Sequence, residues 1–134
     1  MTHDEIVQFV DDLYAATGSG DWERANAMLT EDLVITEAAG LPMAGTYTGQ
    51  NALHDLFIDV FATLNVSGLE RIQTVTGGDY AVTILKMQFA GEGLEDAELC
   101  EMFRFRDGKC CEIKPYYFDP APVLAAAKHK QAAG

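Results

Sequence analysis

Hydrophobic residues in the first half of the chain recur every three or four positions, which is the period of an amphipathic helix. A Thr-x-x-Glu capping box at Thr2 and Glu5 predicts the start of the first helix. Asp21 is expected to cap a short second helix. The predicted helices and extended segments of this half cover, in order, residues 2–18, 22–29, 33–37, 45–49 and 53–64.

In the second half the pattern changes to alternation of apolar and polar residues, which is typical of strands with one buried face. The expected strands cover residues 67–76, 80–90, 97–106 and 110–118. Glycine-containing turns at 77–79 and 107–108 predict tight hairpins between them. Asp119 and Pro120 then predict the start of a last helix over 121–130.

Helices followed by a strand meander indicate an α+β fold in which the helices cover one face of the sheet. The 134 residues fit a single domain, 1–134. We expect a curved antiparallel sheet wrapped around the N-terminal helices as a cone. The interior of such a cone is the natural place for a ligand.

Charge narrows the choice of partners. The formal net charge is −12 and the sequence pI is about 4.4. Such a surface repels phosphate backbones and anionic lipids, so neither nucleic acid nor a membrane is an expected partner. The N-terminus carries no secretion signal, and the three cysteines form no disulfide pattern, so we expect a cytoplasmic protein.

Glu101 is the most informative anomaly in the sequence. Alternation along 97–106 puts it on the same face as Leu99, Phe103 and Phe105, which is the core face. A carboxyl group among apolar side chains has to be paired, hydrogen-bonded or neutral. Because burial raises its pKa, Glu101 is a candidate proton-bearing donor.

Two further groups are expected to face the same cavity. Glu37 ends the first strand on the face of Leu33 and Ile35, at the predicted rim of the cone, and Tyr14 closes the apolar stripe of the first helix. Two carboxyls and a phenol around an apolar cavity suit proton transfer next to a carbonyl. One carboxylate removes the proton, and two neutral donors hold the enolate oxygen.

Purely structural interpretations of these residues stay open. Glu101 would then pair with an arginine or a helix N-terminus, Glu37 would face solvent, and Tyr14 would be a core residue. His3, His54 and His129 share no ligand spacing, so no metal site is expected, and the proposed chemistry needs no cofactor.

Four stretches resemble the NTF2-like superfamily, in particular its SnoaL-like and ketosteroid-isomerase-like members. They are Gly20–Glu23, Glu31–Gly40, Gly45–Gly49 and Ile113–Pro120. The resemblance covers nearly the whole chain and implies the cone-shaped, cystatin-like fold. It says little about activity, because this fold hosts isomerases, cyclases, hydrolases and non-catalytic modules.

The resemblance also implies roles for individual residues. Glu37 falls where ketosteroid isomerases place their aspartate base, Glu101 where they keep a protonated aspartate, and Tyr14 matches their oxyanion tyrosine if the following loop is one residue shorter here. A carboxylate base beside a neutral carboxylic acid is thus the arrangement that the resemblance to ketosteroid isomerases implies. Both acids are glutamate in this chain, and Ala38 replaces the usual proline.

The aromatic residues expected to contact substrate are Phe57, Phe61, Phe103 and Tyr117. We therefore expect a cofactor-free isomerase or cyclase that acts on a small apolar carbonyl compound. The alternative is a ligand-binding or association module without chemistry. The resemblance to limonene-epoxide hydrolases, which use an arginine and two aspartates, is poor, because Leu99 falls where their arginine would be expected. The resemblance further implies a homodimer formed through the outer sheet face, which carries Cys100 and Met102.

Overall fold

The computed structural model describes residues 1–133, which form four helices and one six-stranded sheet. The helices are α1 (His3–Gly18), α2 (Trp22–Ala27), α3 (Ala52–Thr63) and α4 (Ala121–Ala133). The strands are β1 (Leu29–Glu37), β2 (Gly45–Thr48), β3 (Val66–Gly77), β4 (Tyr80–Phe89), β5 (Ala97–Arg106) and β6 (Lys109–Tyr117).

The helices begin where the capping residues predict. The Thr2 hydroxyl accepts a hydrogen bond from the Glu5 amide at 3.2 Å, and the Glu5 carboxylate accepts one from the Thr2 amide at 2.9 Å. Asp21 caps α2 through the Arg24 amide, and the Asp119 side chain caps α4. These contacts satisfy amides that the first turn of a helix leaves without partners.

The sheet has the strand order β2-β1-β6-β5-β4-β3. The predicted meander of β3 to β6 is antiparallel throughout, but β1 runs parallel to β6, with Ile35 beside Ile113. The expectation of a wholly antiparallel sheet is therefore wrong at this one pair. A parallel pair needs a long crossover connection, and here β2, α3 and three strands separate the two partners.

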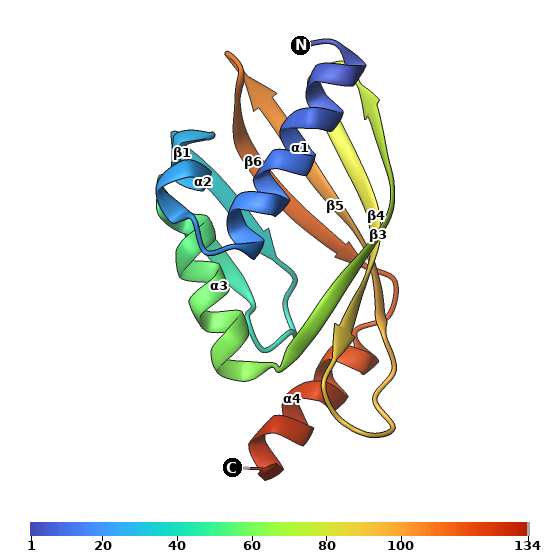
Figure 1. The fold of residues 1–134 in the computed structure, drawn as a ribbon. Coiled ribbons are helices and arrows are strands. Elements are labelled where there is room, and N and C mark those ends of the chain that lie inside the picture. The colour runs from blue at the N-terminus through green and yellow to red at the C-terminus, as the bar shows by residue number, and fades with distance from the viewer. Residues whose placement is uncertain (134) are drawn as a thin grey trace.

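Helices and sheet enclose the core between them (Figure 1). The sheet curves, α1 lies across one face of it, and α2 and α3 lie beside β1. Apolar residues of α1, such as Ile6, Val10 and Leu13, are almost fully buried against this face. The α+β cone predicted from the sequence is confirmed.

The largest difference from the predicted boundaries lies between the second helix and the first strand. The second helix ends at Ala27, and Leu29, expected in that helix, begins β1 four residues earlier than predicted. Leu29 is fully buried and lies opposite Cys110 of β6. Its burial is as compatible with a strand as with a helix, so only the pairing with β6 decides the conformation.

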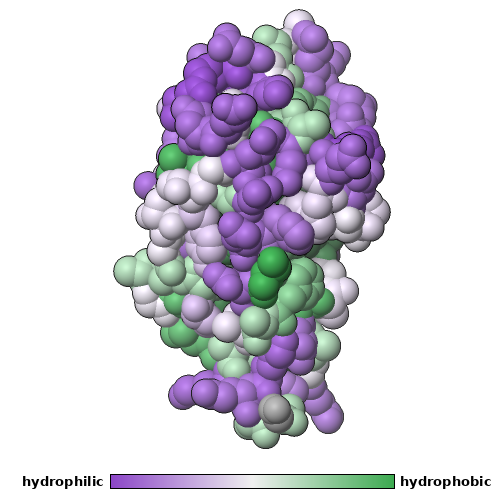
Figure 2. Space-filling model, turned by 90° about the vertical axis from the view of Figure 1, so that its left-hand side faces the viewer, coloured by the Kyte–Doolittle hydropathy of each residue, from purple (hydrophilic) through white to green (hydrophobic). Residues whose placement is uncertain are grey.

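The surface beside α3 has a hydrophilic part and a hydrophobic part. Figure 2 shows mostly hydrophilic residues over the upper part of this side, while hydrophobic residues gather over its lower half. Ile58 and Phe61 on α3 belong to the exposed apolar residues, at 57% and 52% exposure. Within residues 1–133, no helix is both long and apolar enough to cross a membrane.

Candidate functional site

A cavity of about 490 Å³ opens between α1, α3 and the concave face of the sheet. This volume lies in the range of small-molecule sites. Most of the lining is hydrocarbon. The lining side chains that carry polar groups are Tyr14, Thr17, Glu37, Ser67, Arg71, Glu101 and Tyr117.

All seven residues singled out in the sequence line this cavity. They are Tyr14, Glu37, Phe57, Phe61, Glu101, Phe103 and Tyr117. They come from α1, β1, α3, β5 and β6, so only the folded chain brings them together. Their assignment to catalysis or substrate binding stays a prediction.

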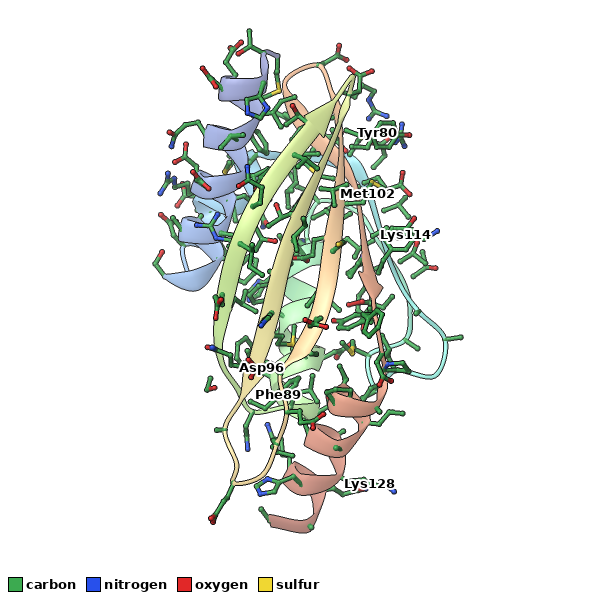
Figure 3. All side chains as sticks on the ribbon, turned by 90° about the vertical axis from the view of Figure 1, so that its right-hand side faces the viewer. Tyr80, Phe89, Asp96, Met102, Lys114 and Lys128 are labelled. Atoms are coloured by element: carbon green, nitrogen blue, oxygen red, sulfur yellow. The ribbon has the colours of Figure 1, made fainter. Side chains whose placement is uncertain are left out.

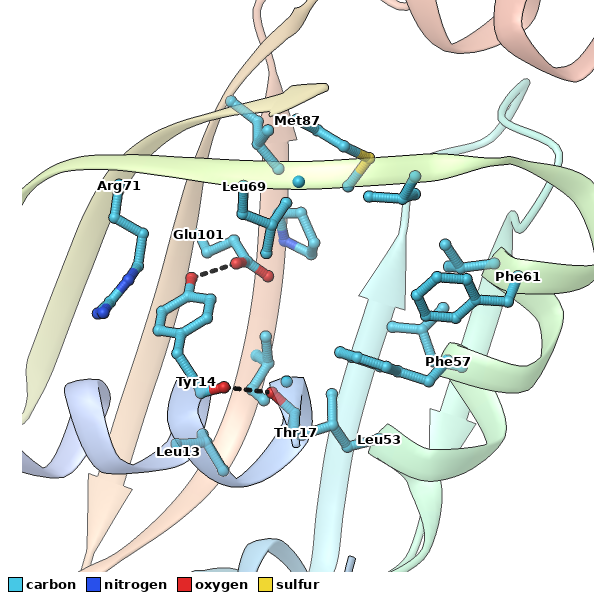
Figure 4. A pocket seen from close by; sticks show the side chains of 18 of the residues that line it. Leu13, Tyr14, Thr17, Leu53, Phe57, Phe61, Leu69, Arg71, Met87 and Glu101 are labelled. Atoms are coloured by element: carbon cyan, nitrogen blue, oxygen red, sulfur yellow. Dashed lines mark hydrogen bonds between the residues drawn. The ribbon is translucent and has the colours of Figure 1, made fainter. Parts of the chain in front are cut away.

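A polar contact between Tyr14 and Glu101 joins α1 to β5 in the cavity wall. The Tyr14 hydroxyl donates a hydrogen bond to Oε1 of Glu101 (Figure 4). Tyr14 sits near the end of α1, and the Phe103 ring meets it edge to face at 6.1 Å. Burial raises the pKa of Tyr14, and the neighbouring Glu101 raises it further, so the phenol stays a proton donor.

Glu101 owes its position to strand alternation on β5, as the sequence predicts. Its neighbours in register are Thr83 on β4 and Pro115 on β6, and neither side chain carries a charge. Its partner is therefore a phenol, not the arginine or helix N-terminus that the structural interpretation required. Burial raises the pKa of Glu101, while the hydrogen bond from Tyr14 opposes that rise.

Glu37 is the most exceptional group of the site. It is the last residue of β1 and only 5% exposed, so it lies neither in solvent nor at an open rim. Its Oε1 is buried and has no hydrogen-bond partner within residues 1–133. Burial, and then the charge of Glu101, raise its pKa from 4.5 to about 8.

Sheet register explains why the two carboxyl groups face one space. Ile35 lies beside Ile113, and continuing this register by two residues puts Glu37 beside Pro115. Pro115 in turn lies opposite Glu101. Neighbouring strands are about 4.8 Å apart, so the Cα atoms of the two glutamates are about 10 Å apart across one proline. Both side chains line the same cavity.

The aromatic lining is uneven. Phe103 is 3% exposed and packs behind Tyr14, whereas half of the surface of Phe61 is exposed, which places Phe61 at the outer part of the cavity. Phe57 lies between them in exposure and contacts Trp22 edge to face at 5.0 Å. Burial raises the pKa of the Tyr117 hydroxyl, and Glu37 adds to this.

The sequence analysis missed two inward-facing residues, Arg71 and Thr83. Arg71 on β3 lines the cavity, and Thr83 is fully buried beside Glu101 and shares a 2.9 Å hydrogen bond with Thr74. The argument that identified Glu101 would have found Thr83, because alternation from Ala81 to Leu85 puts it on the buried face. Arg71 could not have been found in this way, because no residue of β3 is fully buried and Leu69, two positions earlier, is 42% exposed.

Within the described residues, no group of three or more His, Cys, Asp or Glu side chains is placed to hold a metal ion. The polar groups of the side chains that line the cavity are carboxyls, phenols, hydroxyls and one guanidinium. Such a set can donate and accept protons and can stabilise an oxyanion.

Comparisons with known proteins agree with this fold. A family model described as SnoaL-like domain matches residues 10–113. No curated protein matches the chain at a significant level.

Solved structures share the shape at low sequence identity. An NTF2-like protein from Burkholderia xenovorans LB400 is 22% identical, with 95% of this chain and 98% of that chain covered and a TM-score of 0.76. Bal32a from a soil-derived mobile gene cassette is 17% identical, with coverage of 93% and 98% and a TM-score of 0.81. TerC, co-crystallized with polyporic acid, is 14% identical, with coverage of 92% and 98% and a TM-score of 0.76. At these identities the likeness shows the fold alone.

Proposed function

The chain belongs to the family of SnoaL-like domains, and from this premise we propose that its cavity catalyses cofactor-free proton transfer next to a carbonyl group. The substrate would be a small, largely apolar compound, and the reaction an isomerisation or a cyclisation. The observation that carries the proposal is that Glu37, whose buried Oε1 has no hydrogen-bond partner within residues 1–133, lines the same cavity as the Tyr14–Glu101 pair.

Each residue has a defined role in this proposal. The substrate carbonyl oxygen lies at Tyr14 and Glu101, and the ionised Glu37 removes a proton from the adjacent carbon. The electron pair of that C–H bond forms a C=C bond to the carbonyl carbon, the π pair of the C=O bond moves to the oxygen, and the resulting oxyanion accepts hydrogen bonds from the Tyr14 hydroxyl and from protonated Glu101. Glu37 then returns the proton to another carbon, which gives an isomer. Alternatively, the enolate carbon attacks a second carbonyl of the substrate, the π pair of that carbonyl moves to its oxygen, and this oxygen takes the proton from Glu37, which gives a hydroxylated ring.

The electrostatics favour these roles. A general base works best when its pKa lies near the working pH, and the pKa of Glu37 is raised to about 8. Burial also favours a neutral Glu101 that can donate a hydrogen bond. TerC, a neighbour in fold, was co-crystallized with polyporic acid, which supports an organic compound as the occupant here.

A second candidate function is a ligand-binding or association module without chemistry. The hydrogen bond between Tyr14 and Glu101 favours this alternative, because each group already satisfies the other without a substrate. The two functions differ in whether a bound carbonyl compound exchanges its protons.

Exchange of the protons next to the carbonyl of 2-tetralone in D₂O, followed by proton NMR, separates the two functions. We expect the protein to accelerate this exchange, and we expect the rate to rise with pH until Glu37 is ionised, with a midpoint near 8. Glu37→Gln is expected to lower the rate by about 100-fold or more, the usual size of a general-base contribution.

The matched control is Glu98→Gln, which removes the same charge from an exposed position on the same strand as Glu101. We expect this variant to exchange protons at the normal rate. If Glu37→Gln exchanges protons as fast as Glu98→Gln, then Glu37 is not the base.

A further inference from the structure

Arg71 approaches Tyr14 from the side opposite Glu101. Its Cζ atom lies 4.7 Å from the centroid of the Tyr14 ring, so the guanidinium covers one face of the phenol. Figure 4 shows Arg71 descending from β3 beside Tyr14, with Glu101 beyond the hydroxyl. Among the residues of 1–133 that line the cavity, Arg71 alone carries a positive charge.

Asp11 holds this guanidinium in place. The Arg71 Nη1 atom donates to Oδ1 of Asp11 at 2.7 Å. Asp11 and Tyr14 are three residues apart on α1, so their side chains lie on the same side of the helix. One guanidinium therefore contacts α1 twice, once through its charge and once through the aromatic ring.

The backbone of β3 is irregular next to this contact. Its pairing with β4 shifts register between Arg71 and Gln73, which marks an irregularity directly after the arginine. Arg71 lies opposite the buried Leu85, and Thr74 beyond the shift lies opposite the buried Thr83. Bulges of this kind re-aim a side chain and are frequent beside active sites.

Stability alone is a poor explanation for the arrangement. The side chains of Arg71 and Asp11 are 35% and 47% exposed, and exposed ion pairs contribute little. The effect on Tyr14 is more specific. A cation over an aromatic face is attracted by the ring electrons and favours negative charge on the phenol oxygen.

We propose that Arg71, held by Asp11, is a positioning residue that fixes the Tyr14 ring and makes its hydroxyl a stronger hydrogen-bond donor toward the oxyanion. The inference rests on the proposed function for its catalytic consequence, but the contact itself can be tested without turnover. In the transition state the oxyanion draws the phenol proton toward itself, and the guanidinium stabilises the charge that this leaves on the tyrosine oxygen.

The charged groups around Tyr14 support this direction. Glu101 on β5 and burial raise the pKa of Tyr14, whereas Arg71 on β3 lowers it. Thr83 on β4 also lowers it and carries no charge. Asp11 lies on the same helix and is bound to Arg71. Arg71 is thus the one positive group that opposes Glu101 at this phenol.

The test replaces Tyr14 alone with 3,5-difluorotyrosine, whose more acidic hydroxyl brings its ionisation into a measurable range. Ultraviolet absorbance then follows the ionisation of that single residue. With Arg71→Met, which keeps a flexible chain over the ring but removes the charge, we expect the phenol to ionise about tenfold less readily, as for a partly buried cation–π contact. Arg71→Lys is expected to restore part of the effect.

The matched control is Arg106→Met, which removes another half-exposed arginine and its ion pair with Asp32, away from the cavity. We expect no change in the ionisation at position 14. The inference is overturned if Arg71→Met and Arg71→Lys both leave the ionisation at position 14 as it is in the parent protein.

Proton exchange of 2-tetralone provides the catalytic arm. Arg71→Met is expected to lower kcat about tenfold with little change in KM, and to have no effect once Tyr14 is phenylalanine. An equal loss in the Tyr14→Phe background would show that Arg71 acts on the fold and not through Tyr14. If the parent protein shows no exchange, the proposed function fails, while the ionisation measurement still decides the role of Arg71.

Discussion

Glu37 is deeply buried, and its Oε1 has no hydrogen-bond partner within residues 1–133, which has a consequence for stability. Its pKa is about 8 in the folded protein, against an ordinary value of 4.5. Between these values the folded state holds a proton that the unfolded state has lost. Folding is therefore favoured at the acidic end of this window, and the advantage disappears as pH rises through 8.

We predict that the free energy of unfolding falls as pH rises from about 4.5 to 8, by up to about 1.4 kcal/mol per pH unit from Glu37. Urea denaturation at several pH values measures this slope. Glu37→Gln is expected to remove this contribution, because glutamine does not titrate, while Glu98→Gln keeps it. A Glu37→Gln protein with the same slope as the parent would contradict the assignment.

The inward position of Glu101 could be predicted from the sequence because β5 alternates regularly from Leu99 to Phe103. The burial of Glu37 and the hydrogen-bond partner of Glu101 could not be predicted in this way. The burial of Glu37 depends on what covers the end of β1, and strand alternation does not reveal that. The partner of Glu101 depends on how α1 lies across the sheet, so Tyr14 could be nominated but its hydrogen bond could not be.

At the scale of elements, the sequence predicts local structure better than pairing. Capping residues and hairpin turns locate the helices and the antiparallel strands closely. The parallel pairing of β1 with β6 joins segments about 80 residues apart, so no local pattern reports it. The register shift in β3 is also invisible, since the alternation around Arg71 and Ile72 reads as a plain strand.

The parallel β1–β6 pair and the register shift in β3 position the residues of the site. The register of the β1–β6 pair, continued by two residues beyond Ile35, puts Glu37 beside Pro115, which lies opposite Glu101. The shift in β3 accompanies the placement of Arg71 over Tyr14. The chemistry-bearing residues can therefore be found one strand at a time, but their arrangement follows from non-local pairing.

At the scale of the whole molecule, the outer face of the sheet is not covered by a helix. Figure 3 shows Tyr80, Met102 and Lys114 on the side of the sheet that points away from α1. Ile84 and Tyr116 on the same face are 38% and 53% exposed. An exposed apolar patch of this kind often marks an interface, and we propose that two copies of the chain associate through it.

The mass in solution, measured by light scattering after size exclusion, tests this proposal. We predict a particle of twice the chain mass of 14.6 kDa. Ile84→Glu is expected to give the monomer, because it buries a charge in the interface. Ile58→Glu makes the same substitution on the exposed side of α3 and is expected to leave the dimer intact. A parent protein that is monomeric at micromolar concentration would rule the dimer out.

The proposed proton transfer depends on a carboxyl group in the cavity that keeps its proton near neutral pH. Infrared spectroscopy sees the C=O stretch of a protonated carboxyl separately from that of a carboxylate. We predict such a band for the parent protein at pH 7, a partial loss on raising the pH with a midpoint near 8 as Glu37 ionises and Glu101 keeps its proton, and a weaker band in Glu37→Gln. A band that disappears near pH 4.5, as for an ordinary glutamate, would contradict the proposed proton transfer.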